Sequence, residues 1–120
     1  MARDLVVKAT CGADDAERVN QAFTVAAAAV ASGARVSLWL TGEAAWFAVP
    51  GRAASFSLPL ATPLASLLDA VLAGGSVTVC SQCAERRDIM SSSVVDGIRI
   101  AGAAVFTEEI LADGVQALVY

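Results

Sequence analysis

The chain has 120 residues, a length typical of one domain, so we expect a single domain over residues 1–120. Hydrophobic residues make up 57% of the sequence and charged residues only 17%, which excludes a disordered chain. The net charge is −4, and no basic cluster is larger than the pair Arg86 and Arg87. A nucleic-acid-binding surface needs clustered lysines and arginines to contact the phosphates, and this sequence has no such cluster, so we expect no nucleic-acid partner.

The apolar stretches are too short to span a membrane or to serve as a secretory signal. The longest uninterrupted one covers residues 25–31, against the roughly 18–20 residues that a bilayer requires. Near the start, Asp4 and Lys8 flank an apolar run of residues 5–7, too short for a signal. We therefore expect a cytoplasmic protein with no membrane partner. Its excess of apolar surface predicts contacts between subunits.

The chain begins with a strand, a turn and a long helix. An apolar run predicts the strand over residues 5–9, and residues 10–12 form the turn after it. Asp14 or Asp15 can cap the helix, because a carboxylate at this position accepts from free backbone N–H groups. Apolar residues at helical spacing continue to about Ser32, where we expect the helix to end.

The middle of the chain contains a second strand and a second long helix. The strand is expected over residues 35–40, followed by a short helix over 43–49. The segment 52–62 has no clean period and predicts a loop with extended pieces. Thr62 before Pro63 has the pattern of a helix start, and the leucine stripe that follows predicts a helix up to the Gly-Gly pair.

Three further strands complete the pattern. They are expected over residues 76–80, 98–101 and 115–119, with a helix over 103–112 between the last two. Strands that alternate with helices pair in parallel and are covered on both faces. The sequence therefore predicts a three-layer α/β/α sandwich with a five-stranded parallel sheet, of flavodoxin-like architecture, and leaves the strand order open.

The residue types present narrow the chemistry. Histidine is absent, so neither a Ser-His-Asp triad nor a Cys-His pair can form within this chain. Three cysteines without histidine fall short of the four ligands of a closed zinc site, and we expect no metal. No glycine-rich phosphate-binding motif is present, and we expect no cofactor. An odd number of cysteines also argues against a disulfide framework.

Two of the cysteines form a CxxC motif, in which Ser81 and Gln82 separate Cys80 from Cys83. The motif falls where a predicted strand passes into a helix. Free N–H groups and the helix dipole at such a position favour the thiolate, so we expect both thiols to be acidified. Cys80 can then attack a sulfane sulfur or a disulfide, and Cys83 can assist or resolve the product. A thioredoxin-like oxidoreductase fits less well, because here the motif follows the third strand and no tryptophan precedes it.

Other residues are candidates to support the motif. Cys11, followed by Gly12, lies at another predicted strand end and is expected at the same edge of the sheet as Cys80. A buried, inert thiol is an equally good interpretation of Cys11. Arg86 and Arg87 lie about one helical turn after the motif, which brings a guanidinium near its second thiol.

Several segments together resemble the DsrE/DsrF-like family of small sulfur-relay proteins. They are Val-Lys-Ala-Thr-Cys-Gly at 7–12, Asp-Asp-Ala-Glu-Arg-Val at 14–19, Leu-Trp-Leu-Thr-Gly-Glu-Ala at 38–44, Val-Cys-Ser-Gln-Cys-Ala-Glu-Arg-Arg at 79–87 and Asp-Gly-Ile-Arg-Ile-Ala-Gly-Ala-Ala-Val-Phe at 96–106. The resemblance implies a five-stranded parallel sandwich that assembles as a homotrimer or homohexamer. It also implies a persulfide on the cysteine after the third strand, here Cys80, with Cys83 matching a second cysteine of the homo-oligomeric members.

Three hypotheses follow for the function. The first is a cytoplasmic sulfur carrier or sulfurtransferase that exchanges sulfane sulfur with donor and acceptor proteins or small thiols through Cys80. The second is an oligomeric module that binds a small ligand beside the 52–62 loop. The third is a redox switch in which Cys80 and Cys83 form a reversible disulfide.

Overall fold

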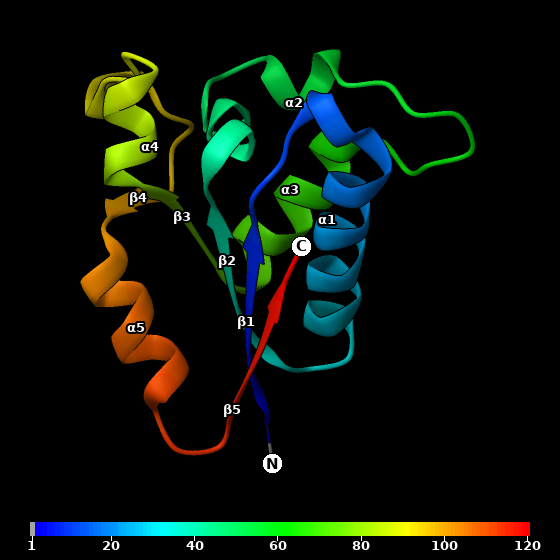
Figure 1. Ribbon diagram of the computed structural model, residues 1–120. Coiled ribbons are helices and arrows are strands. Elements are labelled where there is room, and N and C mark those ends of the chain that lie inside the picture. Colours follow the sequence, from blue (N-terminus) through cyan, green and yellow to red (C-terminus); the bar gives the residue numbers. More distant parts are fainter. Residues whose placement is uncertain (1) are drawn as a thin grey trace.

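The computed structural model describes residues 2–120 and consists of five parallel strands between two layers of helices (Figure 1). The predicted fold class is confirmed. The sheet has the order β4-β3-β2-β1-β5, so β4 and β5 form its edges. The strands are β1 (Asp4–Ala9), β2 (Arg35–Leu40), β3 (Ser76–Cys80), β4 (Ile98–Ala101) and β5 (Val115–Val119).

Helices α1 (Ala16–Ala31) and α3 (Leu64–Gly74) pack side by side on one face of the sheet (Figure 1). The face of α1 that packs inward combines Val19 and Phe23 with two alanines, and all four side chains are buried. Alanines allow the close approach of a neighbouring backbone. None of the helices between residues 2 and 120 combines the length and the apolar character needed to cross a bilayer.

Short helices make up most of the connections at the carboxyl ends of the strands. They are η1 (Ala13–Asp15), η2 (Gly42–Ala48), α2 (Arg52–Ser55), α4 (Ser81–Arg86) and η3 (Ser91–Ser93). The segment expected as a loop from residue 52 thus begins with one turn of helix, too short to leave a period in the sequence. The expected cap at Thr62 is also wrong. Pro63 is the cap residue of α3, and its carbonyl accepts from the N–H groups of Ser66 and Leu67.

Helix α5 (Ala103–Leu111) lies on the opposite face of the sheet (Figure 1). Most of the side chains that it meets there are polar. The strand register aligns Lys8, Trp39, Thr78 and Arg99 across four strands. Trp39 is buried, and its ring meets the edge of Phe106 of α5 with the centroids 5.3 Å apart.

The carboxylate of Glu109 connects α5 to this row. It accepts from the Ser37 hydroxyl at 2.6 Å and from Trp39 Nε1 at 3.0 Å. Its other oxygen is ion-paired with Arg99. Burial raises the pKa of Glu109, but these hydrogen bonds and the Arg99 charge outweigh burial and lower the pKa below the ordinary 4.5. The ionised form therefore fits this site better than the neutral form.

Replacement of Glu109 by glutamine tests this contact. A lowered folded-state pKa stabilises the protein above the unfolded pKa, and this contribution is lost as the pH falls through the folded pKa. At pH 7 we expect the free energy of unfolding of Glu109→Gln to fall by about 1–2 kcal/mol, measured by urea denaturation. The difference should shrink as the pH falls below 4.5. Glu108→Gln, at the exposed neighbouring position, is the control and should change little.

Candidate functional site

The CxxC motif lies where the carboxyl ends of the central strands meet, at the upper end of the sheet in Figure 1. Cys80 is the last residue of β3 and the residue that precedes the first turn of α4. Its side chain is half-buried, whereas that of Cys83 in α4 is buried. All three cysteines of the chain are free thiols. The first cysteine of the motif is thus the accessible one, and the second lies behind it.

The surroundings of Cys80 favour its thiolate. Burial raises the pKa of Cys80, but hydrogen bonds from the backbone N–H and the thiol of Cys83 lower it. The backbone N–H of Gln82 and the positive charge of Lys8 lower it further. The lowering contributions win, so the pKa lies below the ordinary 9.0, as expected for the first thiol of this motif.

Cys83 is held by the backbone of a different loop. The N–H of Gly42, the first residue of η2, donates to Cys83 Sγ at 3.2 Å. Gly42 has φ +55, and a Cβ atom there would lie 2.4 Å from the carbonyl oxygen of Thr10. Only glycine fits this position without strain. The second thiol is therefore anchored to the turn after β2.

The arginines that follow the motif do not contact its sulfur atoms. Arg87 donates from Nη1 to the carbonyl oxygen of Cys83 at 3.1 Å, and its Nε lies 2.8 Å from a carboxylate oxygen of Glu43. Arg86 is exposed. A guanidinium thus lies near Cys83 as expected, but against its carbonyl oxygen, and the Arg87 charge is paired with Glu43, which joins α4 to η2.

The two residues between the cysteines have different surroundings. Ser81 is half-buried and lies against the chain just before α5, where a Cβ atom on Gly102 would lie 3.2 Å from Ser81 Oγ. The Gln82 side chain is exposed, so this residue acts on Cys80 through its backbone N–H alone.

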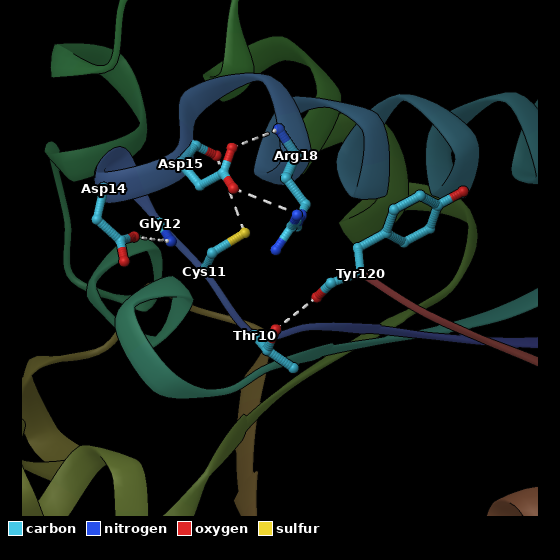
Figure 2. Close-up of polar contacts among 7 residues, drawn as sticks. All are labelled: Thr10, Cys11, Gly12, Asp14, Asp15, Arg18 and Tyr120. Atoms are coloured by element: carbon cyan, nitrogen blue, oxygen red, sulfur yellow. Dashed lines mark hydrogen bonds and ion pairs between the residues drawn. The ribbon is translucent and has the colours of Figure 1, made fainter.

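Cys11 lies in the turn after β1 and is buried (Figure 2). Its Sγ is 3.9 Å from the carbonyl oxygen of Asp15. Burial raises the pKa of Cys11, and the carboxylates of Asp15 and Asp14 raise it further, while Arg18 opposes them in part. The structure therefore stabilises the neutral thiol of Cys11, in contrast to Cys80.

The turn around Cys11 is held by side-chain contacts to the backbone that Figure 2 shows together. Asp15, one of the two predicted capping residues, caps α1 by accepting from the N–H of Arg18, and Asp14 accepts from the N–H of Gly12 at 2.7 Å in the turn before the helix. A Cβ atom on Gly12 would lie 2.5 Å from the carbonyl oxygen of Glu43. Gly12 thus allows the turns after β1 and β2 to touch.

Sequence reasoning missed three residues of this site: Lys8, Gly42 and Glu43. Gly42 had a signal, because a Thr-Gly pair directly follows a predicted strand at the same edge as the motif. Lys8 is the only lysine of the chain and interrupts an apolar strand. A lone charge in an apolar strand is a signal of a specific role. In the fold, Lys8 lies on the same face of the sheet as Cys80.

A cavity of about 190 Å³ lies beside the predicted loop. The guanidinium of Arg52 stacks on Trp46 there, 4.4 Å from the ring centroid. Glu43, which binds Arg87, also lines it. Between residues 2 and 120 no three acidic or cysteine side chains gather in a way that could hold a metal ion.

The sequence of the chain matches the DsrE/DsrF-like family over residues 5–119. The chain belongs to this family. Its membership indicates a role in sulfur relay, while a search of curated proteins found no match.

Solved structures resemble this DsrE/DsrF-like protein in fold. The ychN protein from E. coli is 17% identical over the whole of both chains, with a TM-score of 0.80. A protein of unknown function from Methanobacterium thermoautotrophicum, MTH1491, is 10% identical, with a TM-score of 0.70 over 98% of this chain and 99% of its own. BT1422 from Bacteroides thetaiotaomicron is 17% identical, with a TM-score of 0.58 over 98% and 95%.

The contrast between Cys80 and Cys11 predicts the order in which the thiols of this DsrE/DsrF-like protein react. The pKa of Cys80 is lowered and that of Cys11 is raised from the ordinary 9.0. Alkylation by iodoacetamide follows the thiolate, so its rate at Cys80 should reach half-maximum below pH 9. Peptide mass spectrometry across a pH series measures both sites. Equal midpoints for Cys80 and Cys11 would contradict the assignment.

Proposed function

We propose that this protein is a sulfur carrier that holds sulfane sulfur as a persulfide on Cys80 and passes it to an acceptor thiol. The observation that carries the proposal is the half-buried thiol at the end of β3, whose pKa is lowered by N–H groups of the following turn and by Lys8. A lowered pKa increases the fraction of the accessible thiolate, which is the nucleophile that sulfur transfer requires. Membership of the family supports the same role.

The loading step is a thiol–disulfide-type exchange. The Cys80 thiolate attacks the outer sulfur of a donor persulfide, R–S–SH. A bond forms between Sγ and that sulfur while the S–S bond of the donor breaks. The leaving thiolate R–S⁻ takes the electron pair, and the proton stays on the transferred sulfur. Release is the same exchange, in which an acceptor thiolate attacks the outer sulfur and Cys80 departs as a thiolate.

The buried Cys83 assists sulfur transfer by stabilising the thiolate of Cys80. Its thiol donates a hydrogen bond to Cys80, and its own sulfur accepts the N–H of Gly42. This chain of donors stabilises negative charge on Cys80 each time that residue leaves as a thiolate. The cavity beside Glu43 and Trp46 adds a concave surface near the same end of the sheet. Donor and acceptor are proteins or small thiols, and the reducing cytoplasm is the compartment that keeps such thiols free.

Intact mass measurement after exposure to a small persulfide tests the carrier function. We expect an adduct of about 32 Da that a reducing agent removes. Cys80→Ser should abolish it, and Cys83→Ala, which removes the side-chain donor to Cys80, should slow its formation by reducing the thiolate fraction of Cys80. Cys11→Ser is the matched control and should leave the adduct unchanged.

Other outcomes separate the alternatives. An adduct that persists in Cys80→Ser would refute the assignment of the carrier residue. A Cys80–Cys83 disulfide in place of the adduct would support the redox switch. Ligand binding that survives serine at both positions, without any adduct, would support a binding module at the cavity lined by Trp46, Phe47 and Arg52.

We also propose that the protein assembles with copies of itself, as a homotrimer or homohexamer, through the β5 edge. Among residues 2–120, β5 pairs only with β1, and it contains no charged residue. Its residues Leu118 and Val119 are 41% and 63% exposed, and Leu111 at the end of α5 is 75% exposed. An exposed, uncharged edge strand is a template for association, and proteins that stay monomeric usually protect such an edge with charge.

Charged substitutions at this edge test the assembly. In sedimentation velocity we expect the wild-type protein to be an oligomer. The double variant Leu118→Glu, Leu111→Lys should be a monomer, because burial of a charge opposes association. Leu60→Lys is the control, since Leu60 is fully exposed on a different loop. A monomeric wild-type protein would refute the proposal.

A further inference from the structure

Lys8 lies on the same face of the sheet as Cys80. Its side chain shares a row with Trp39 and Thr78 in the strand register. Cys80 follows Thr78 by two residues in β3, so its side chain lies on the same face, one row nearer the carboxyl edge. The Lys8 ammonium lies 4.9 Å from the ring centroid of Phe106 in α5. This cation–π contact directs the flexible side chain along the face that holds the thiol.

The Lys8 ammonium has no carboxylate partner among residues 2–120, whereas the neighbouring guanidinium groups are ion-paired. Arg99 of β4 is ion-paired with Glu109 of α5, and Arg87 of α4 is ion-paired with Glu43 of η2. Lys8 makes no ion pair with any residue from 2 to 120. It therefore supplies a positive charge without an ion-pair partner among these residues on the face that holds Cys80, in a protein whose net charge is −4.

We infer that Lys8 makes the Cys80 site selective for negatively charged sulfur donors, namely small persulfides whose organic part carries carboxylate groups. The inference rests on the proposed carrier function and names its substrate class. An anionic donor is repelled by the thiolate that must attack it, and a fixed cation beside that thiolate offsets the repulsion. A neutral or cationic donor gains nothing from the same cation, so the charge creates a preference.

The Lys8 charge also stabilises the leaving group of the loading step. When Cys80 attacks the outer sulfur of R–S–SH, the donor S–S bond breaks and R–S⁻ leaves with the electron pair. The leaving group of an anionic donor then carries one more negative charge than before. The step transfers no proton to or from Lys8, so this residue determines specificity and is not an acid or base.

Two alkylating reagents of nearly equal size measure this preference without any sulfur transfer. Iodoacetate is anionic and iodoacetamide is neutral. We consider the rate of iodoacetate at Cys80 divided by the rate of iodoacetamide. In Lys8→Met this ratio should fall roughly three- to tenfold at low ionic strength, and the difference between the variant and the wild type should shrink as salt is added. Methionine keeps an unbranched apolar stem against Phe106. Arg86→Met, which removes an exposed cation from α4, is the matched control and should leave the ratio near its wild-type value.

Further variants keep the test decisive. Lys8→Arg should retain the wild-type ratio, and Lys8→Gln replaces Lys8→Met if thermal unfolding shows that the methionine variant does not fold. An unchanged ratio in the uncharged variant, or an equal fall in Arg86→Met, would overturn the inference.

A second measurement separates this inference from the carrier function. Loading of Cys80 by glutathione persulfide, which is anionic, is compared with loading by cysteamine persulfide, which is cationic. We expect Lys8→Met to lower the ratio of the first rate to the second, since any change in the thiolate fraction of Cys80 affects both rates equally. If the wild-type protein takes sulfur from neither, the carrier function fails, while the alkylation ratio still decides whether Lys8 selects for charge.

Discussion

The close approach of two backbone turns is the constraint on which the site depends. Gly42 passes the carbonyl of Thr10, and Gly12 passes the carbonyl of Glu43, so closely that a Cβ atom at either glycine would overlap an oxygen atom. This contact fixes the direction of the Gly42 N–H group, which bonds to the sulfur of Cys83. A motif that lies 41 residues later in the chain is thereby positioned by the end of β2.

The two faces of the sheet differ in character, and the reactive thiol belongs to the polar one. The face under α1 and α3 is closed by aliphatic and aromatic side chains, among them Phe23 against Phe47. The face under α5 carries a row of polar side chains instead, and Glu109 neutralises only Arg99 within it. The remaining charge of Lys8 therefore acts on Cys80. A second apolar layer on this side would have left the thiol without an electrostatic partner.

Local patterns predicted most of the fold, and contacts distant in sequence account for what they missed. The strand 76–80 and the CxxC motif at its end could be read directly, because a β-branched run followed by a helix start leaves a local signal. Strand order leaves none, since right-handed crossovers permit several orders. The pairing of Arg87 with Glu43 joins residues 44 positions apart, so helical spacing placed that guanidinium near Cys83 but gave no sign of the carboxylate that pairs with it. Lys8 likewise had no signal in the sequence that linked it to the thiol, because only the strand register places it on the same face of the sheet as Cys80.

The apolar excess of the composition and the chemistry of the thiol occupy different parts of the molecule. The alanine-rich helix α1 uses Ala22 and Ala26 inside the core, so its composition does not by itself create exposed apolar surface. The large exposed apolar side chains of β5 and α5 lie instead along one edge of the sheet, whereas Cys80 lies at its carboxyl end. Association through that edge would leave the end of β3 open to a donor. The two proposals are therefore compatible, since assembly through the β5 edge leaves Cys80 open to the proposed anionic donors.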